Sequence, residues 1–366
     1  MTIQDETRNT QTRFTKAGGV AGRRGIRVSV RTLLLGAGAL TSLLTIGCAT
    51  LAPTASAAPQ AMNKAARSAS PHGTASVAYA GSLQLVNDQT VGPAFVKATG
   101  DGYQGRGGGS FGIAQLIASK EITPNVFESI GTGPVRILEP KFTRWAIGFA
   151  SSPLVIAYSP TSPFATRLRA IALGREPLKD LFALLGEKAF HLGRTNPQTD
   201  PQGQAFIFML RLAKRVYHLK PGTANHILGG IQNPQQIFAE EDILSRLQSG
   251  QLDASSAFLP EAIQRHLPYI ALPPSIDLGS VAYEKEYATE TLRLDSGKVV
   301  KGAPLEVYIT SLTGAPDAAS GLAFVHFVLS EQGEQLYKSS GFALTPKVVF
   351  GDRQAIPATL LPLLGR

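Results

Sequence analysis

The chain has 366 residues, enough for about two domains. Hydrophobic residues make up 43% of it and charged residues 17%, which excludes an intrinsically disordered protein. The formal net charge of +9 falls to +4 without residues 1–47, which hold seven of the 35 basic and two of the 26 acidic residues. Because the remaining excess is small and forms no basic stripe or known motif, nucleic acid is excluded as a partner.

Residues 1–47 have the pattern of an export signal. A basic segment, Arg23–Arg31, precedes an apolar stretch, Thr32–Ile46, that is too short and too rich in small residues for a secure membrane span. Cys48 follows directly, in the sequence Leu-Thr-Ile-Gly-Cys, which resembles a lipobox. We therefore expect cleavage before Cys48 and a lipid anchor on it. The alternative is cleavage before Ala58, which follows an A-x-A site.

The stretch 48–75 is rich in Ala, Ser and Pro, as a flexible tether is. Cleavage before Cys48 would leave a cell-surface lipoprotein that meets the membrane only through its lipid. Cleavage before Ala58 would release a soluble exported, periplasmic protein. Because Cys48 is the sole cysteine, an intrachain disulfide is excluded and stability must come from core packing.

From Ser76 onward, strand and helix patterns alternate, which predicts an α/β protein with parallel sheets. The expected strands are 76–80, 154–158, 269–272 and 305–310. One helix is expected to start at Gly81-Ser82, and others to cover 111–119, 178–185, 240–249, 318–330 and 331–340. Residues 101–107, DGYQGRG, are polar and glycine-rich and carry no strand pattern.

The segment His191–Tyr217 contains the most informative helix start. A polar loop leads into Asp200-Pro201, and an amphipathic run follows. Asp is a preferred N-cap and Pro favours the first helical position, so we expect a helix to begin here, with Gly203 keeping its first turn open. A helix start offers unpaired N–H groups and a positive partial charge, which suit an oxyanion. An ordinary capped helix is the alternative, and the commoner meaning of this pattern.

The same segment carries a family resemblance. Gly193–Gly203, GRTNPQTDPQG, resembles the pattern G-x-[ST]-[ND]-P-x-x-D-P-x-G of the molybdate/tungstate-binding proteins that serve ABC importers. Six further segments agree in order, from about Ser76 to the C-terminus. They are AGSL at 80–83, GGGSFGIAQLI at 107–117, FASSPLVIAYSPTS at 149–162, LQSGQLDASSAF at 247–258, LPYIALPPSIDL at 267–278 and AFVHFVLSEQGEQLYKSSGF at 323–342.

This resemblance implies a two-lobed type II periplasmic-binding-protein fold of the α/β class, with a hinge of two crossover strands. We place the crossings near 149–158 and 267–278. Lobe one would then comprise 76–152 plus 275–366, and lobe two 153–274. The resemblance also implies an exported, monomeric solute-binding component that captures molybdate or tungstate and presents it to a membrane permease. It implies no enzyme activity and no cofactor.

The resemblance also implies which residues hold the ligand. Molybdate and tungstate are dianions, so nearly every oxygen needs a hydrogen-bond donor when buried. Ser82 in AGSL and Ser110 in GGGS match positions whose hydroxyl and N–H groups contact the anion, although each is also a common kind of N-cap residue. Gln202 and Gly203 match a turn that donates backbone N–H groups.

Asp200 needs a separate explanation, because a carboxylate repels a dianion. In the tungstate-binding branch of the family, an Asp here and a later Glu coordinate the metal directly, and Asp200 matches that Asp. The Glu position falls on Ala257, and the Tyr position of the other branch falls on Phe258, so this chain departs from both. Substitutes for the missing group are Ser256 or its neighbour Ser255, or Glu261 if the register shifts. The alternative is that Asp200 is only a helix cap.

Two rival functions remain open. Gly108–Gly112 fits the G-x-S-x-G pattern of serine hydrolases, with Ser110 as nucleophile and Asp253 and His266 following in order. That motif needs a strand immediately before it, which 101–107 does not predict. The closer rival is a binder of sulfate, phosphate or a small carboxylate. The six histidines lack ligand spacing, so no transition-metal site is expected.

Overall fold

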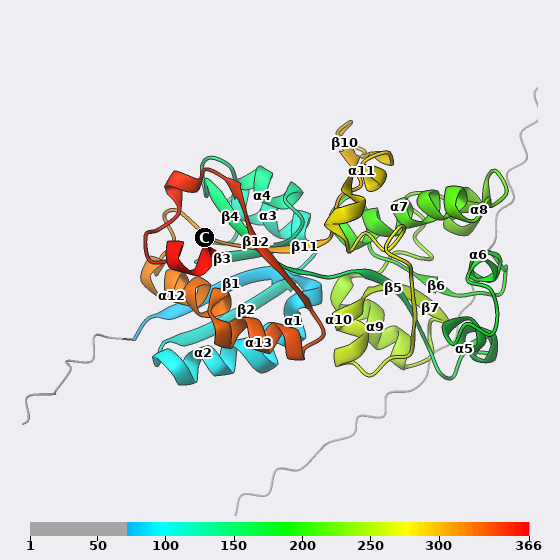
Figure 1. The fold of residues 1–366 in the computed structure, drawn as a ribbon, viewed down its shortest axis with the longest axis horizontal. Coiled ribbons are helices and arrows are strands. Elements are labelled where there is room, and N and C mark those ends of the chain that lie inside the picture. The colour runs from blue at the N-terminus through cyan, green and yellow to red at the C-terminus, as the bar shows by residue number, and fades with distance from the viewer. Residues whose placement is uncertain (1–71, 366) are drawn as a thin grey trace, which may run out of the picture. The chain divides into compact units, whose positions relative to one another are not determined.

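The computed structural model describes residues 72–365, so the export signal, Cys48 and Ala58 lie outside the described chain. The described residues form two large sheets and a small two-stranded one (Figure 1). We call the six-stranded sheet with its helices lobe one, and the four-stranded sheet with its helices lobe two. The expected two-lobed α/β architecture is confirmed.

Lobe one is built first, from strands that lead directly into helix starts. Its elements in this part of the chain are β1 (Thr74–Ala80), η1 (Gly81–Leu83), α1 (Gln84–Val86), the π-helix η2 (Asn87–Val91), α2 (Gly92–Thr99), β2 (Gly102–Gly108), α3 (Ser110–Ala118), β3 (Val126–Ile130), α4 (Gly133–Leu138) and β4 (Trp145–Ser151).

Only Ser152 and Pro153 separate β4 from the first strand of lobe two. The elements of lobe two are β5 (Leu154–Tyr158), α5 (Ala165–Ala172), α6 (Lys179–Leu184), β6 (Leu192–Gly193), α7 (Pro201–Val216), α8 (Thr223–Leu228), α9 (Glu240–Gln248), β7 (Ala254–Phe258), α10 (Leu259–Gln264) and β8 (Tyr269–Ala271).

After β8 the chain forms a small hairpin that contacts α7 of lobe two, and it then completes the sheet of lobe one. The elements after β8 are η3 (Val281–Tyr283), α11 (Glu284–Tyr287), the hairpin strands β9 (Thr291–Arg293) and β10 (Val299–Lys301), β11 (Glu306–Ser311), α12 (Ala318–Leu329), α13 (Glu331–Ser339), β12 (Ala343–Gly351), η4 (Arg353–Ala355) and η5 (Leu361–Leu364).

Both large sheets are mixed, so the expectation of parallel sheets is wrong. In lobe one the strand order is β12-β4-β11-β3-β1-β2, and only the pairs of β1 with β2 and β3 are parallel. In lobe two the order is β6-β7-β5-β8, and only β6 with β7 is parallel. Strand β11 enters lobe one from lobe two and therefore runs against both of its neighbours. The returning chain, rather than a strand-helix-strand unit, sets its direction.

The polar segment before Ser110 is a strand, which the sequence did not predict. Strand β2 is an edge strand that pairs in parallel with β1 over its whole length, from Thr74 with Gly102 to Ala80 with Gly108. A Cβ on Gly105 would lie 2.2 Å from Asp88 Oδ1 and 2.7 Å from the Tyr79 hydroxyl. The glycine is therefore needed for close packing, and backbone pairing rather than apolar burial makes this strand.

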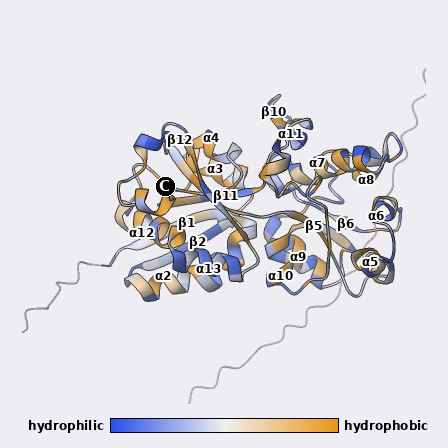
Figure 2. Cartoon of the chain, viewed as in Figure 1, coloured by the Kyte–Doolittle hydropathy of each residue, from blue (hydrophilic) through white to orange (hydrophobic). Residues whose placement is uncertain are grey.

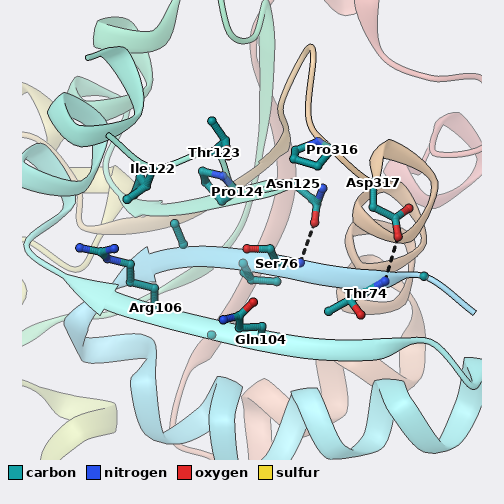
Figure 3. A pocket seen from close by; sticks show the side chains of 14 residues that line it. Thr74, Ser76, Gln104, Arg106, Ile122, Thr123, Pro124, Asn125, Pro316 and Asp317 are labelled. Carbon is teal, nitrogen blue, oxygen red and sulfur yellow. Dashed lines mark hydrogen bonds between the residues drawn. The ribbon is translucent and has the colours of Figure 1, made fainter. Parts of the chain in front are cut away.

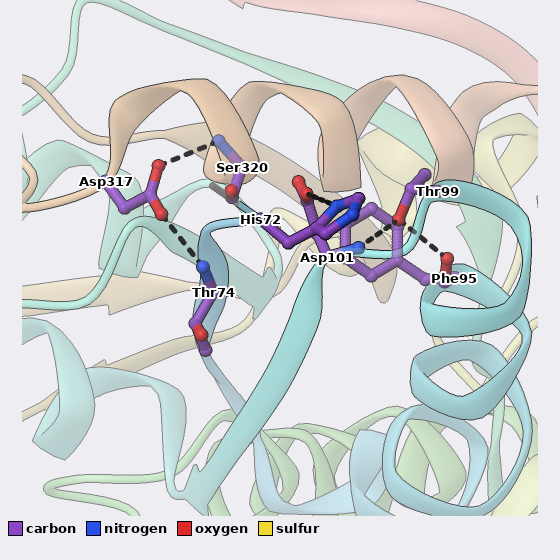
Figure 4. A network of polar contacts seen from close by, with 7 residues as sticks. All are labelled: His72, Thr74, Phe95, Thr99, Asp101, Asp317 and Ser320. Atoms are coloured by element: carbon purple, nitrogen blue, oxygen red, sulfur yellow. Dashed lines mark hydrogen bonds and ion pairs between the residues drawn. The ribbon is translucent and has the colours of Figure 1, made fainter. Parts of the chain in front are cut away.

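The start of β1 is held to lobe one by acidic side chains (Figure 4). Asp317 Oδ1 accepts a hydrogen bond from the Ser320 N–H at 3.1 Å, and Asp317 Oδ2 accepts one from the Thr74 N–H at 2.8 Å. These two backbone bonds lower the pKa of Asp317. His72 Nδ1 lies 3.8 Å from Asp101 Oδ1. Strand β1 thus begins two residues earlier than expected and includes two residues that we had assigned to the tether.

Helix α7 carries both hydrophobic and hydrophilic residues (Figure 2), as its amphipathic sequence predicts. Its first ten residues, Pro201–Leu210, are all buried, whereas Lys214 and Arg215 in its last turn are exposed. The start of the helix is therefore fixed inside lobe two. None of the helices within residues 72–365 has the length and apolar content needed to cross a membrane.

Candidate functional site

The start of α3 faces lobe two. Gly109 is its N-cap and contributes no side-chain hydrogen bond. The buried Ser110 Oγ accepts a hydrogen bond from the Ile130 N–H at 3.2 Å, which leaves the hydroxyl proton of Ser110 to donate. The next two N–H groups, of Phe111 and Gly112, donate to the Thr199 carbonyl at 3.0 and 3.1 Å. The first donors of a lobe-one helix therefore meet the loop before α7 in lobe two.

The start of α7 is capped by the side chain of Asp200, as the sequence predicts. Asp200 is the N-cap, and its Oδ1 accepts the Gln202 N–H at 2.7 Å. A Cβ on Gly203 would lie only 2.4 Å from the Thr195 carbonyl oxygen and 2.8 Å from the Pro197 nitrogen. The absence of a side chain at Gly203 is thus a packing requirement. The polar loop folds back onto the first turn of the helix.

The side chains of Gln202 and Ser256 contact each other inside lobe two. Ser256 Oγ donates to Gln202 Oε1 at 2.9 Å, and Gln202 Nε2 donates to Glu261 Oε2 at 3.1 Å. Glu261 Oε2 also accepts the Phe258 N–H at 2.8 Å. This network joins α7, β7 and α10. Gln202, Gly203 and Ser256 stay predictions as ligand-binding residues, since their observed contacts are with the protein.

Ser82 lies in η1, at the end of β1, and is 3% exposed. Its Oγ has no hydrogen-bond partner among the described residues. The preceding Gly81 lies against Glu240, because a Cβ there would be 2.6 Å from Glu240 Oε2. Glu240 is the first residue of α9 and comes from lobe two. The sequence predicts the helix that starts at Glu240, but it gives no indication of a role for this glutamate.

One pocket of about 320 Å³ lies where these segments meet. Gly109 lines it from lobe one, beside Ser110, while Asp200 and Glu240 line it from lobe two. None of the described residues that line it is basic. The lining residues are Gly109, Thr195, Asn196, Thr199, Asp200, Ile237, Phe238, Ala239 and Glu240. The starts of α3, α7 and α9 therefore line this pocket, and Gly81 of η1 lies against one of the lining residues, Glu240.

A second pocket, of about 650 Å³, lies on lobe one near the first half of β1 (Figure 3). Thr74, Ser76, Gln104, Arg106 and Asn125 line it, and the Asn125 Oδ1 accepts the Ser76 N–H at 2.7 Å. None of the ligand-binding residues expected from the sequence lines this pocket. Its larger volume therefore does not make it the candidate site.

In the described chain, the three residues of the alternative serine-hydrolase site are not hydrogen-bonded to one another. Asp253 Oδ2 lies 3.3 Å from His191 Nδ1 and accepts the His191 N–H at 2.7 Å, while Asp253 Oδ1 accepts the Ser162 hydroxyl at 2.6 Å. Within residues 72–365, no hydrogen bond or ion pair connects Ser110, Asp253 and His266. The strand before Ser110 exists, but the rest of the catalytic arrangement is not assembled.

The two positions that match the family's Glu and Tyr ligands are buried. Ala257 and Phe258 are completely buried at the end of β7. The described part of the chain brings together no group of three or more His, Cys, Asp or Glu residues suited to a metal ion. Asp200 and Glu240 are the acidic residues among those that line the smaller pocket.

Residues 75–343 match the family described as bacterial extracellular solute-binding protein. A Haloferax volcanii relative, named as the molybdenum-binding protein of an ABC transporter, is 28% identical over 271 residues, which are 74% of this chain and 82% of the relative. The molybdate/tungstate-binding protein WtpA of Pyrococcus abyssi is 28% identical over 238 residues, which are 59% of this chain and 67% of the relative.

The periplasmic molybdate-binding protein of Azotobacter vinelandii has a similar fold, with a TM-score of 0.52 at 18% identity. The alignment covers 74% of this chain and 98% of that protein. At this identity the likeness concerns the fold alone, and it agrees with the two-lobed architecture expected from the sequence.

Proposed function

The chain belongs to the bacterial extracellular solute-binding protein family, and on that premise we propose that it captures molybdate or tungstate for an ABC importer. In this proposal the ligand is bound between the lobes, and the loaded protein presents it to a membrane permease. The binding component carries out no chemical step. Export, with a lipid anchor on Cys48, is part of the proposal, and so are the lobe boundaries near residues 152 and 275.

The observation that carries the proposal is the convergence of three helix starts, those of α3, α7 and α9, at one pocket. Helix starts concentrate N–H donors and positive partial charge, which together stabilise an oxyanion. Ser82 adds a buried hydroxyl with no partner among the described residues, and Ser110 adds a hydroxyl proton. Two relatives named for molybdenum, molybdate or tungstate binding support the choice of ligand.

A second candidate ligand is a protonated oxyanion such as hydrogen phosphate. The carboxylates of Asp200 and Glu240 line the pocket, and an ionised carboxylate accepts hydrogen bonds but donates none. A ligand that carries a proton can donate to such a group, whereas sulfate at neutral pH cannot. This chemistry ranks phosphate above sulfate as the alternative.

A thermal-shift panel separates these candidates, because a ligand that binds the native state raises the melting temperature. The panel would contain molybdate, tungstate, sulfate, phosphate and thiosulfate at equal ionic strength. We expect molybdate or tungstate to give the largest shift. A larger shift with phosphate would replace the proposed ligand by the alternative, and no shift with any of the five would refute oxyanion binding.

The double variant Ser82→Ala/Ser110→Ala tests the site itself. It should weaken binding by roughly 2–6 kcal/mol, at about 1–3 kcal/mol for each charge-assisted hydrogen bond. Isothermal titration calorimetry with tungstate would measure the loss. The control Ser119→Ala/Ser339→Ala removes two exposed hydroxyls at helix ends and should bind as the wild type does. Equal affinities in the two double variants would remove Ser82 and Ser110 from the site.

A further inference from the structure

The pocket of about 650 Å³ on lobe one is lined by polar side chains that have few partners. Its floor is one face of β1 and β2, whose parallel pairing places Ser76 beside Gln104 and Ala78 beside Arg106. Because Ser76 and Ala78 are small, they leave space above this floor. Among the described residues, the side chains of Ser76, Gln104 and Arg106 form no hydrogen bond or ion pair. Their polar groups are therefore available to a ligand.

A buried amide lines the same pocket. Asn125, directly before β3, is 2% exposed and is bonded twice to β1. Its N–H donates to the Ser76 carbonyl at 2.7 Å, and its Oδ1 accepts the Ser76 N–H at 2.7 Å (Figure 3). These bonds fix the amide, whose Nδ2 has no hydrogen-bond partner among the described residues. An unpartnered buried donor is costly, and an acceptor on a ligand would remove that cost.

The two charged residues of the lining, Arg106 and Asp317, lie at opposite ends of the pocket (Figure 3). Arg106 pairs with Ala78, whereas Asp317 Oδ2 accepts the N–H of Thr74, four residues earlier in β1. At about 3.3 Å for each residue of a strand, these two places on β1 are about 13 Å apart. Asp317 already accepts two backbone N–H groups, those of Thr74 and Ser320. Arg106 is therefore the charge that a ligand can use.

This lining suits a carboxylate that also carries hydroxyl groups. A guanidinium binds a carboxylate through paired N–H donors. The hydroxyl of Ser76 and the amide of Gln104 can both donate and accept, and so can the hydroxyls of a sugar acid. Ser76, which holds the Asn125 amide, is two residues from Ala78, which pairs with Arg106. The two donors are thus about 7 Å apart along β1, a distance that a sugar-sized molecule spans.

We propose that this pocket binds a polyhydroxylated carboxylate, such as a sugar acid. Arg106 holds the carboxylate, and the Asn125 amide donates to a hydroxyl oxygen. The pocket lies near the start of β1, whereas Ser82 follows the end of that strand, and it shares no lining residue with the pocket proposed for the oxyanion. The inference is therefore independent of the proposed capture of molybdate or tungstate.

Isothermal titration calorimetry on the full chain tests the ligand class. The probes are gluconate and glucuronate, which carry both groups, sorbitol, which lacks the carboxylate, and hexanoate, which lacks the hydroxyls. We expect one of the two sugar acids to bind at least about tenfold more tightly than sorbitol and hexanoate. No binding of either sugar acid, or equal binding of all four probes, would overturn the proposal.

Three variants test the residues, with the better sugar acid as the probe. Arg106→Gln should weaken binding at least about tenfold, and Arg106→Lys should lose less because it keeps the charge. Asn125→Asp keeps an acceptor for the Ser76 N–H but loses the donor, so it should also weaken binding about tenfold. Arg175→Gln removes an exposed arginine of lobe two and is the matched control, with no expected effect.

Circular dichroism melting shows whether each variant is folded. Wild-type affinity in Arg106→Gln would overturn the proposal even if Asn125→Asp does not fold. Wild-type affinity in a folded Asn125→Asp would remove the amide from the site. Tungstate binding should be unchanged in both variants. A wild type that binds the sugar acid but no oxyanion would refute the proposed function and leave this inference standing.

Discussion

Helices α3 and α7 start at the same pocket but are completed in different ways. In α7, Asp200 caps its own helix through the Gln202 N–H. In α3, Gly109 has no side chain, and the N–H groups of Phe111 and Gly112 donate to the Thr199 carbonyl in the other lobe. The start of α7 is therefore a property of lobe two alone, whereas the start of α3 is completed by contact between the lobes.

The third residue of each helix is a glycine, and the space around the two glycines differs. A Cβ on Gly203 in α7 would lie 2.4 Å from the Thr195 carbonyl oxygen. A Cβ on Gly112 in α3 would have the Thr199 Cβ as its nearest neighbour, at 3.8 Å. Helix α7 is thus packed tightly against its own loop at this position, whereas α3 has room for a methyl group at Gly112.

The largest expected effect comes from exchanging these glycines for alanine. Gly203→Ala should lower the free energy of unfolding by about 3 kcal/mol, because rigid backbone atoms block the new methyl group. Gly112→Ala should raise it by up to about 1 kcal/mol, because alanine favours the helix. Urea unfolding followed by circular dichroism would measure both. Equal effects of the two substitutions would contradict the contrast between the helix starts.

Lobe one also contains a buried acidic residue in its sheet. Glu128 in β3, two residues before the partner of Ser110, is completely buried and accepts a hydrogen bond from Asn87 Nδ2. Burial raises its pKa from 4.5 to about 7, although the bonds from Asn87 and Tyr337 oppose the shift. The folded state then keeps a proton that the unfolded state has lost, so this contribution to stability is fully present below about pH 4.5 and is lost as the pH rises through 7.

The decline between pH 4.5 and 7 should amount to about 3 kcal/mol, at about 1.4 kcal/mol for each unit of pKa shift. Glu128→Gln should remove that decline, because the amide does not titrate. Unfolding free energies of the wild type and the variant, measured across this range, provide the test. Parallel pH profiles would show that Glu128 is not the group responsible.

Gly109 tests the contact between the lobes directly. Its Cβ would lie 2.8 Å from the Thr199 carbonyl oxygen and 3.1 Å from Asp200 Oδ2. Gly109→Ala should therefore push the two helix starts apart and weaken tungstate binding about tenfold. Gly112→Ala, which meets no such obstacle, serves as the control in the same titration. Loss of affinity in both variants, or in neither, would argue against a ligand held between these helix starts.

The smallest effect is expected from the cap of α7. Asp200→Ala should lower the free energy of unfolding by about 1 kcal/mol, the usual cost of losing an N-cap. Asp200→Asn should preserve stability, because asparagine caps equally well. Thermal unfolding of the two variants would show the difference. If both variants are as stable as the wild type, the bond to the Gln202 N–H does not stabilise the helix.

The sequence predicted those structural elements that are determined by residues close together in the chain. The Asp200 cap, the amphipathic α7 and strands such as β5 follow from neighbouring residues. Strands β3 and β7 were missed, because Glu128 and Ser129 in one and Ser255 and Ser256 in the other interrupt the apolar pattern. All four side chains are buried at 0% exposure, which only the assembled sheets reveal.

The same distinction applies to the residues of the candidate site. Ser82, Ser110 and Asp200 were predicted as site residues because they match recognisable segments at helix starts. Glu240 was not predicted, because it is unremarkable in its local sequence and its place beside Gly81 is a contact between distant parts of the chain.

A crystal grown with tungstate, with diffraction data collected near a tungsten absorption edge, would show where the oxyanion binds. We expect one strong anomalous peak between the lobes, in the pocket lined by Gly109, Asp200 and Glu240. An empty pocket at saturating tungstate, or a peak only outside it, would refute binding of the oxyanion at these helix starts.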